Sequence, residues 1–180
     1  MEITKTPFKD LLVLQPRVFT DERGYFLETW NRVGFSKANL PWDFVQDNQS
    51  GSMANVIRGL HFQMPPHAQG KLIRVISGAV LDIALDLRKN EPTFGKHFKM
   101  HLSAGDNLMV YIPEGFAHGF RTLVNDTIFA YKCTHQYVKE AERTIQWNDP
   151  ALDIDWETDD PVLSDKDMHG KAFSDFSSPF

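Results

Sequence analysis

The run LIRVISGAVLDIALDL, residues 72–87, decides the fold class of this chain. Its second half, residues 79–87, has the alternation expected of a strand, because successive strand side chains point to opposite faces. The two faces are these: Leu81, Ile83, Leu85 and Leu87 on one, and Val80, Asp82, Ala84 and Asp86 on the other. Ser77-Gly78 predicts a hairpin turn that returns this strand against residues 72–76.

Similar short runs lie on both sides of this stretch. Residues 56–63, 108–112 and 127–134 are predicted strands, and residues 11–19 and 24–30 flank a turn at residues 21–24. Many short strands at even spacing predict an all-β sandwich or barrel.

Helices are expected to be few, short and peripheral. One is predicted over residues 31–38, and a second begins at Ser164, a good capping residue. The 180 residues suit one domain, residues 1–180, in which the acidic and then Ser- and Pro-rich part from about residue 150 wraps the barrel.

Composition excludes several classes of protein. A formal net charge of −5 argues against nonspecific nucleic-acid binding, which needs clustered Lys and Arg. No stretch approaches the ~20 apolar residues of a membrane-spanning helix. Cys133 is the one cysteine, so no internal disulfide can form. A cytoplasmic location is therefore expected.

Arg58 and His61 are the first candidates for chemistry. Both lie in residues 55–63, where an ideal strand would send them to opposite faces. Gly59, between them, is a natural site for a β-bulge that turns both inward. Taken alone, a core histidine beside a surface cation is the simpler interpretation. Lys71 at a strand start, Tyr131 in a strand and Asp167 in a helical turn are equally ordinary when taken singly.

Residues 112–120 carry a more specific pattern, Pro-x-Gly-x-x-His, which resembles the second motif of the cupin superfamily. Cupins often bind iron or manganese through three His and one Glu. In the corresponding first motif this chain has His67-Ala68-Gln69, and Ile73 or Arg74 stands in place of the Glu. Gln is a poor ligand for transition metals and Arg would repel the ion, so no metal is expected.

Taken together, the ordered motifs closely resemble the dTDP-4-dehydrorhamnose 3,5-epimerase family of the cupin superfamily. The resemblance runs from about residue 18 to residue 167 and implies a cupin jelly roll. It rests on DERG at 21–24, QDNQS at 46–50, RGLHFQ at 58–63, GFAHGF at 115–120, YKCT at 131–134, WNDP at 147–150 and LSDKD at 163–167.

The resemblance implies epimerisation at C3 and C5 of dTDP-4-dehydro-6-deoxy-D-glucose, without a cofactor. It makes His61 the base, with Asp167 orienting its imidazole. Lys71 would stabilise the oxyanion on the C4 oxygen, and Tyr131 would protonate the opposite face of the ring. The positions implied to bind substrate are Arg23, Glu28, Gln46, Asn48, Arg58, His118, Glu142 and Lys166.

Arg23 and Arg58 suit a diphosphate, which favours forked donors. Phe19 and Phe26 are candidates to hold the thymine. The family is typically a homodimer in which an N-terminal segment reaches the partner, and residues 3–18 are compatible with that arrangement. No role is attached to the tail after Asp167.

Three alternatives stay open at this point. Relatives with the same His, Tyr and Asp epimerise C3 alone or mostly C5. A 3,4-ketoisomerase on a related scaffold is expected to lack the combination of Lys71, Tyr131 and residues 163–167. A sugar-binding cupin without catalysis would not need a base and an acid on opposite sides of its ligand.

Overall fold

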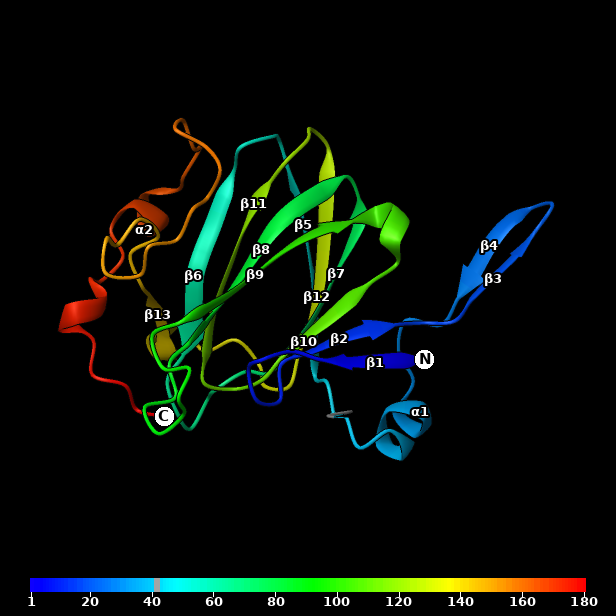
Figure 1. Cartoon of the computed structure of the whole chain (residues 1–180), viewed down its shortest axis with the longest axis horizontal. Helices are drawn as coiled ribbons and strands as arrows, with labels where there is room; N and C mark the ends of the chain where they lie inside the picture. Colours follow the sequence, from blue (N-terminus) through cyan, green and yellow to red (C-terminus); the bar gives the residue numbers. More distant parts are fainter. Residues whose placement is uncertain (41–42) are drawn as a thin grey trace.

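Two facing antiparallel β-sheets form the centre of the computed structural model, which describes residues 1–40 and 43–180 (Figure 1). The larger sheet has six strands, in the order β1 (Glu2–Lys5), β2 (Leu12–Gln15), β10 (Met109–Ile112), β7 (Lys71–Ser77), β12 (Thr127–Cys133) and β5 (Gln46–Ser52). The smaller has five, in the order β13 (Glu142–Thr144), β6 (Ile57–Gln63), β11 (Phe116–Thr122), β8 (Ala79–Asp86) and β9 (His97–Ser103). The predicted all-β jelly-roll sandwich is confirmed.

The remaining elements are peripheral. Among the described residues, strands β3 (Val18–Asp21) and β4 (Gly24–Leu27) pair only with each other, and their hairpin projects away from the sandwich in Figure 1. The helices are α1 (Arg32–Lys37) and α2 (Asp165–Met168), with short 3₁₀ turns η1 (Ala104–Asp106), η2 (Lys139–Ala141) and η3 (Phe173–Asp175). None of the described helices has the length and apolarity to cross a membrane.

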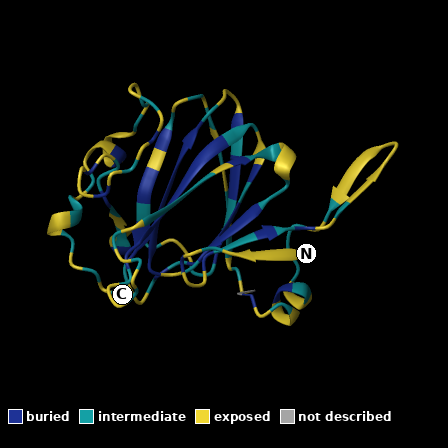
Figure 2. Cartoon of the chain, viewed as in Figure 1, coloured by how far each residue is buried: buried dark blue, intermediate teal, exposed yellow. Residues whose placement is uncertain are grey.

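The strand β8 shows where the apolar cores lie. Val80 and Ala84 face the core between the two sheets, which includes Phe120 and Phe129. The other face of β8, with Leu81, packs in a second core on the outside of the five-stranded sheet. Both faces of β8 are therefore buried, as Figure 2 shows by its dark blue ribbon.

The Ser77-Gly78 turn does not make the predicted hairpin. Strand β7 pairs with β10 and β12, whereas β8 pairs with β9 and β11, so the chain crosses from one sheet to the other at Gly78. Gly78 has a φ of +80°, and a Cβ there would lie 2.4 Å from the hydroxyl of Thr127. The glycine thus serves a corner between the sheets rather than a two-residue hairpin loop.

Both predicted helices are present, with the capping residues that the sequence indicates. Asn31 accepts a hydrogen bond from the backbone N–H of Gly34 at the start of α1, and Ser164 does the same for Asp167 at the start of α2. Short polar side chains at these positions satisfy N–H groups that the helix itself leaves free.

The C-terminal part lies over the outside of the five-stranded sheet (Figure 1). Leu152 and Trp156 are buried in the outer core. Further along, the rings of Phe176 and Phe180 pack edge-on against Phe62 of β6, with ring centroids 5.3 and 6.1 Å away. The tail, to which the sequence assigned no role, seals this core.

Candidate functional site

A cavity of about 360 Å³ opens between the two sheets. It brings together residues from β5, β6, β7, β11, β12 and α2 that are far apart in the sequence. The predicted site residues that line it are His61, Tyr131, Asp167, Lys71, Gln46, Asn48, Arg58, His118, Glu142 and Lys166.

The bulge predicted at Gly59 is present, and it turns the side chains of Arg58 and His61 toward the cavity. The register between β6 and β11 shifts between His118 and Phe120, opposite Gly59. Gly59 has a φ of +133°, and a Cβ at this position would lie 2.4 Å from the Cα of Gly119. Only glycine fits here. The extra residue lets Arg58 and His61 both line the cavity.

His61 and Asp167 form a tight pair, with 2.5 Å between Nε2 and Oδ1. The carboxylate also accepts hydrogen bonds from the hydroxyl of Ser164, at 2.7 Å, and from the backbone N–H of Gly59, at 3.3 Å. Because a carboxylate only accepts, the ring proton of His61 sits on Nε2. The lone pair is then on Nδ1, the atom that can take a proton from a ligand.

Electrostatics favour a neutral imidazole beside an ionised carboxylate. Burial lowers the pKa of His61, and the neighbouring Asp167 opposes this without reversing it. Burial by itself would raise the pKa of Asp167, but the hydrogen bonds from His61 and Ser164 outweigh it and hold the pKa below its ordinary value. A neutral His61 near pH 7 is ready to act as a base.

Lys71 lies beside His61 on the wall made by β7. Its ammonium donates to the backbone carbonyl of His61 at 3.2 Å, and the side chain is buried. Burial lowers its pKa, while Cys133 and Asp82 nearby act in the opposite direction. A buried ammonium held by this hydrogen bond is suited to stabilise negative charge that develops on a ligand.

Tyr131 faces the cavity from the opposite wall. It belongs to β12 of the six-stranded sheet, whereas His61 belongs to β6 of the five-stranded sheet. Burial raises the pKa of the Tyr131 phenol, so it holds its proton at neutral pH. A proton acceptor and a proton donor thus approach the same space from different directions.

A second histidine–carboxylate pair adjoins the first. His118 of β11 bonds through Nε2 to Oδ2 of Asp82, at 2.7 Å, and both side chains are buried. The ring of His118 stacks on Phe129, which in turn stacks on Phe120 with centroids 4.1 Å apart. Asp82 was not predicted to belong to the site. The available signal was a carboxylate within an apolar strand, because a buried carboxylate needs a polar partner.

The mouth of the cavity is polar and includes an aromatic residue that sequence reasoning missed. Tyr137 is half exposed, and its hydroxyl donates to Glu142 at 3.0 Å. Lys166 pairs with the same carboxylate at 2.9 Å. The side chain of Gln46 accepts from the backbone N–H of Tyr137 at 2.7 Å. Tyr137 lies between the strand β12 and the turn η2, in a segment without a periodic sequence pattern from which its position could be predicted.

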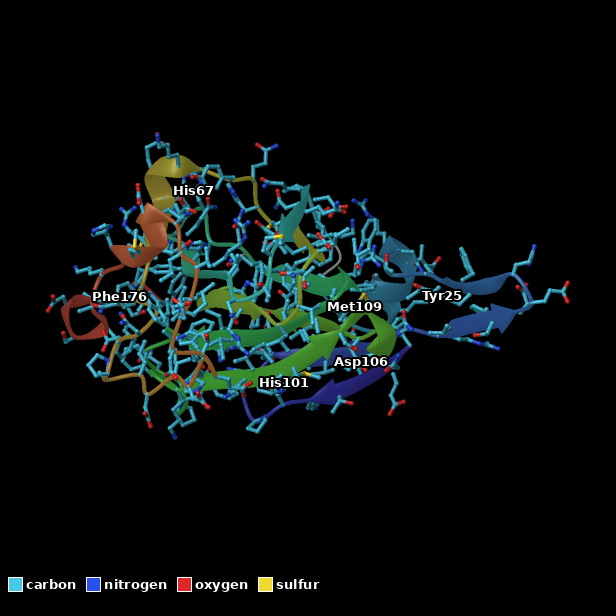
Figure 3. All side chains as sticks on the ribbon, turned by 90° about the horizontal axis from the view of Figure 1, so that it is seen from above. Tyr25, His67, His101, Asp106, Met109 and Phe176 are labelled. Carbon is cyan, nitrogen blue, oxygen red and sulfur yellow. The ribbon has the colours of Figure 1, made fainter. Side chains whose placement is uncertain are left out.

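Two predicted binding residues do not reach this cavity in the same chain. Arg23, at the tip of the β3–β4 hairpin, is 84% exposed and pairs with Asp21 at 2.5 Å. Glu28 accepts a hydrogen bond from Asn31 and lines a separate hollow beside α1. Phe19 and Phe26 also lie exposed on the hairpin, which Figure 3 locates by its label for Tyr25.

Gln69 and Ile73, which stand at positions of cupin metal ligands, make other contacts in this structure. The amide of Gln69 donates to the backbone carbonyl of His135 at 2.7 Å, and Ile73 is buried in the core. Within residues 1–40 and 43–180, no group of three or more His, Cys, Asp or Glu side chains is placed to hold an ion.

The chain is similar to known epimerases along almost its whole length. The family model described as dTDP-4-dehydrorhamnose 3,5-epimerase matches residues 5–175. A protein of that name from Shigella flexneri is 47% identical over 176 residues, 97% of each chain. One from Pseudomonas aeruginosa is 48% identical over 177 residues, again 97% of each chain.

Solved structures agree with this. The crystal structure of a dTDP-4-dehydrorhamnose 3,5-epimerase from Elizabethkingia anophelis superposes with a TM-score of 0.92 at 47% identity, covering 97% of both chains. An epimerase from Legionella pneumophila, solved in complex with dTDP-4-keto-L-rhamnose, gives a TM-score of 0.93 at 39% identity and covers 98% of this chain and 94% of that one.

Proposed function

Because this chain belongs to the dTDP-4-dehydrorhamnose 3,5-epimerase family, we propose that it inverts C3 and C5 of dTDP-4-dehydro-6-deoxy-D-glucose to give dTDP-4-dehydro-L-rhamnose. One observation carries the proposal to this chain's own residues. The imidazole of His61 and the phenol of Tyr131 face one cavity from two different sheets.

The proposed chemistry follows from the ketone at C4, which acidifies the protons at C3 and C5. Nδ1 of His61 removes such a proton, and Asp167 stabilises the resulting imidazolium through Nε2. The electron pair moves onto the C4 oxygen, where the ammonium of Lys71 offsets the negative charge. Tyr131 then gives its proton to the opposite face of the carbon. Exchange with water afterwards removes the proton from His61 and returns one to Tyr131.

The mouth of the cavity is proposed to hold the nucleotide. Arg58 and Lys166 supply positive charge for a diphosphate, and Arg58 can offer a forked pair of donors. The half-exposed ring of Tyr137 provides a face on which a thymine base can stack. Phe19 and Phe26, both on the hairpin, do not line this cavity in their own chain.

A homodimer is the proposed working form. The hairpin carries Arg23, Phe19 and Phe26 away from the sandwich and leaves them exposed. Residues implied to bind substrate but placed outside their own cavity can serve the cavity of a second copy. We therefore assign Arg23 and Glu28 to the site of the partner subunit.

The proposal gives no cofactor and no metal a part in the reaction, so activity should survive exhaustive chelation. A cytoplasmic location is part of the same proposal, and the single buried thiol of Cys133 is in keeping with it.

Turnover in deuterated water tests the function directly. The protein is incubated with dTDP-4-dehydro-6-deoxy-D-glucose, and the sugar is analysed by NMR. Deuterium at both C3 and C5, with formation of the L-rhamno product, supports the proposal. Label at a single centre identifies a monofunctional epimerase, and a ligand that binds without any label identifies a sugar-binding cupin. Either of these results contradicts the double inversion.

A further inference from the structure

Two histidines outside the reaction chemistry face each other at the end of the sandwich away from the hairpin. His67 lies in the loop between β6 and β7, and His135 follows β12. The distance between Nδ1 of His67 and Nε2 of His135 is 3.4 Å, and the rings meet at 69° with centroids 4.9 Å apart. Both side chains are partly exposed, and Figure 3 shows His67 near the edge of the molecule, so a solute can reach the pair.

The position of the ring proton on His135 is set by the backbone carbonyl of the next residue, Gln136. Nδ1 of His135 lies 2.9 Å from the carbonyl oxygen of Gln136. A carbonyl only accepts, so Nδ1 carries the ring proton and Nε2 presents a lone pair to His67. Histidines that bind metals have this arrangement. The ring nitrogen that does not contact the metal donates to a carbonyl, and the other nitrogen is left free to bind the ion. The hydrogen bond from Nδ1 of His67 to Nε2 of His135 is longer than the usual limit of about 3.2 Å for a nitrogen donor. It is therefore weak.

The spacing of the two nitrogens fits an ion between them. A tetrahedral Zn²⁺ with Zn–N bonds of about 2.1 Å holds two of its ligand nitrogens about 3.4 Å apart. We propose that Nδ1 of His67 and Nε2 of His135 bind one divalent transition-metal ion of the kind that imidazole favours, Zn²⁺, Ni²⁺ or Cu²⁺. On binding, the proton of His67 moves from Nδ1 to Nε2 through water, and both rings stay neutral.

Hydrogen bonds already connect the two segments that carry His67 and His135, without an ion. Gln69 donates to the backbone carbonyl of His135, and Gln63 donates to those of His67 and Gln136, at 2.7, 2.7 and 3.1 Å. The site is therefore largely built in advance, which lowers the entropic cost of binding. Among the described residues no third acidic, Cys or His side chain completes a cluster, so water fills the other positions.

The ion would act on the wall of the substrate cavity rather than on the reaction. Gln63 and Gln69 line that cavity. Their side chains also donate hydrogen bonds to the backbone of His67 and of His135, the residues that would bind the ion. Metal binding is expected to fix this wall and to raise the melting temperature, since a ligand that prefers the folded state stabilises it.

Calorimetric titration of the untagged chain with Zn²⁺ and with Ni²⁺ alone tests the site. The wild-type protein should bind one equivalent. His67→Ala and His135→Ala should each weaken binding by more than ~10-fold, since loss of even an outer-shell partner costs about that much. His101→Ala is the matched control, because this histidine is 59% exposed, pairs with Glu157 and lies on β9. It should bind like the wild type.

Electron paramagnetic resonance of the Cu²⁺-loaded wild-type protein provides a second measurement that does not depend on the folding of a variant. Coupling to two imidazole nitrogens is expected. Absence of saturable binding by the wild type, undiminished binding by both histidine variants, or coupling to fewer than two imidazoles would overturn the proposal.

Discussion

His61 and Tyr131 lie on different sheets, so substitutions at the two residues should have different effects on the same reaction. His61→Asn should abolish both solvent exchange and inversion, with a loss of at least ~10²–10⁴-fold, because no other base stands beside Asp167. Tyr131→Phe should suppress inversion but keep exchange, because His61 can return a proton to the face it came from. Lys71→Ala should lower both, since both pass through the enolate. Deuterium incorporation and product formation are measured in parallel.

Tyr111→Phe is the matched control for the phenol. Tyr111 is a buried strand tyrosine that packs in the core beneath α1 and does not line the cavity. It should keep both activities. Equal loss of exchange and inversion in Tyr131→Phe would show that Tyr131 does not act on the opposite face.

The His61–Asp167 pair also predicts a pH dependence. The base must be neutral, so kcat/KM should fall as the pH drops through the pKa of His61, which burial places below the ordinary imidazole value. Asp167 raises that pKa against burial. Asp167→Asn should therefore move the acid limb of the profile to lower pH and also reduce the plateau, because the imidazolium loses its counter-charge.

Asp165→Asn serves as the comparison, because Asp165 is exposed on the same short helix α2. Its profile should match the wild type. A shift of the acid limb to higher pH in Asp167→Asn would contradict the assigned electrostatics.

At the scale of elements, the bulge in β6 should tolerate no side chain. Gly59→Ala combines a φ of +133° with a Cβ placed 2.4 Å from the backbone of Gly119. The free energy of unfolding should fall by more than the ~1–3 kcal/mol of backbone strain alone. Gly51→Ala in β5 should be nearly neutral, since nothing lies within 4 Å of its added Cβ. Urea denaturation of both variants measures the difference, and equal stabilities would refute the role given to Gly59.

Local patterns predicted individual elements well. Alternation identified β8, Gly59 indicated the bulge, and Asn31 and Ser164 marked the starts of the helices. These features depend on neighbours in the sequence. The pairing at Ser77-Gly78 could not be read in the same way, because both faces of β8 are buried and the choice of sheet depends on contacts with distant strands.

The site was predicted unevenly for a similar reason. His61 and Lys71 were predicted from the family resemblance, and the structure places both on the wall of the cavity. Asp82 and Tyr137 were missed, because the first is defined by its contact with His118 and the second by its place at the mouth of the cavity. Arg23 was predicted to bind substrate, but the structure places it exposed on the hairpin, outside the cavity of its own chain.

At the scale of the whole molecule, the proposed dimer predicts complementation between inactive variants. Arg23→Ala should lose activity even though its own cavity is intact. When it is mixed with His61→Asn and the subunits exchange, each mixed dimer regains one complete site. Random exchange makes half of the dimers mixed, so about a quarter of the wild-type activity should return.

The mixture of His61→Asn with Tyr131→Phe is the control. Both lesions lie in the same cavity, so every cavity in any dimer lacks one of the two residues and inversion should not return. Failure of the Arg23→Ala and His61→Asn mixture to recover, despite demonstrated subunit exchange, would exclude a site shared between subunits.

The position of Asp167 on the covering C-terminal segment has a consequence for biosynthesis. Every strand of the two sheets, within the described residues, precedes Asp167 in the chain. During translation the sandwich can therefore start to assemble on the ribosome before Asp167, the carboxylate partner of His61, has emerged. A product that stops early, or one from which a protease has removed the covering segment, would retain His61, Lys71 and Tyr131 without the partner that orients the base. Only polypeptides synthesised beyond Asp167 would then be fully active.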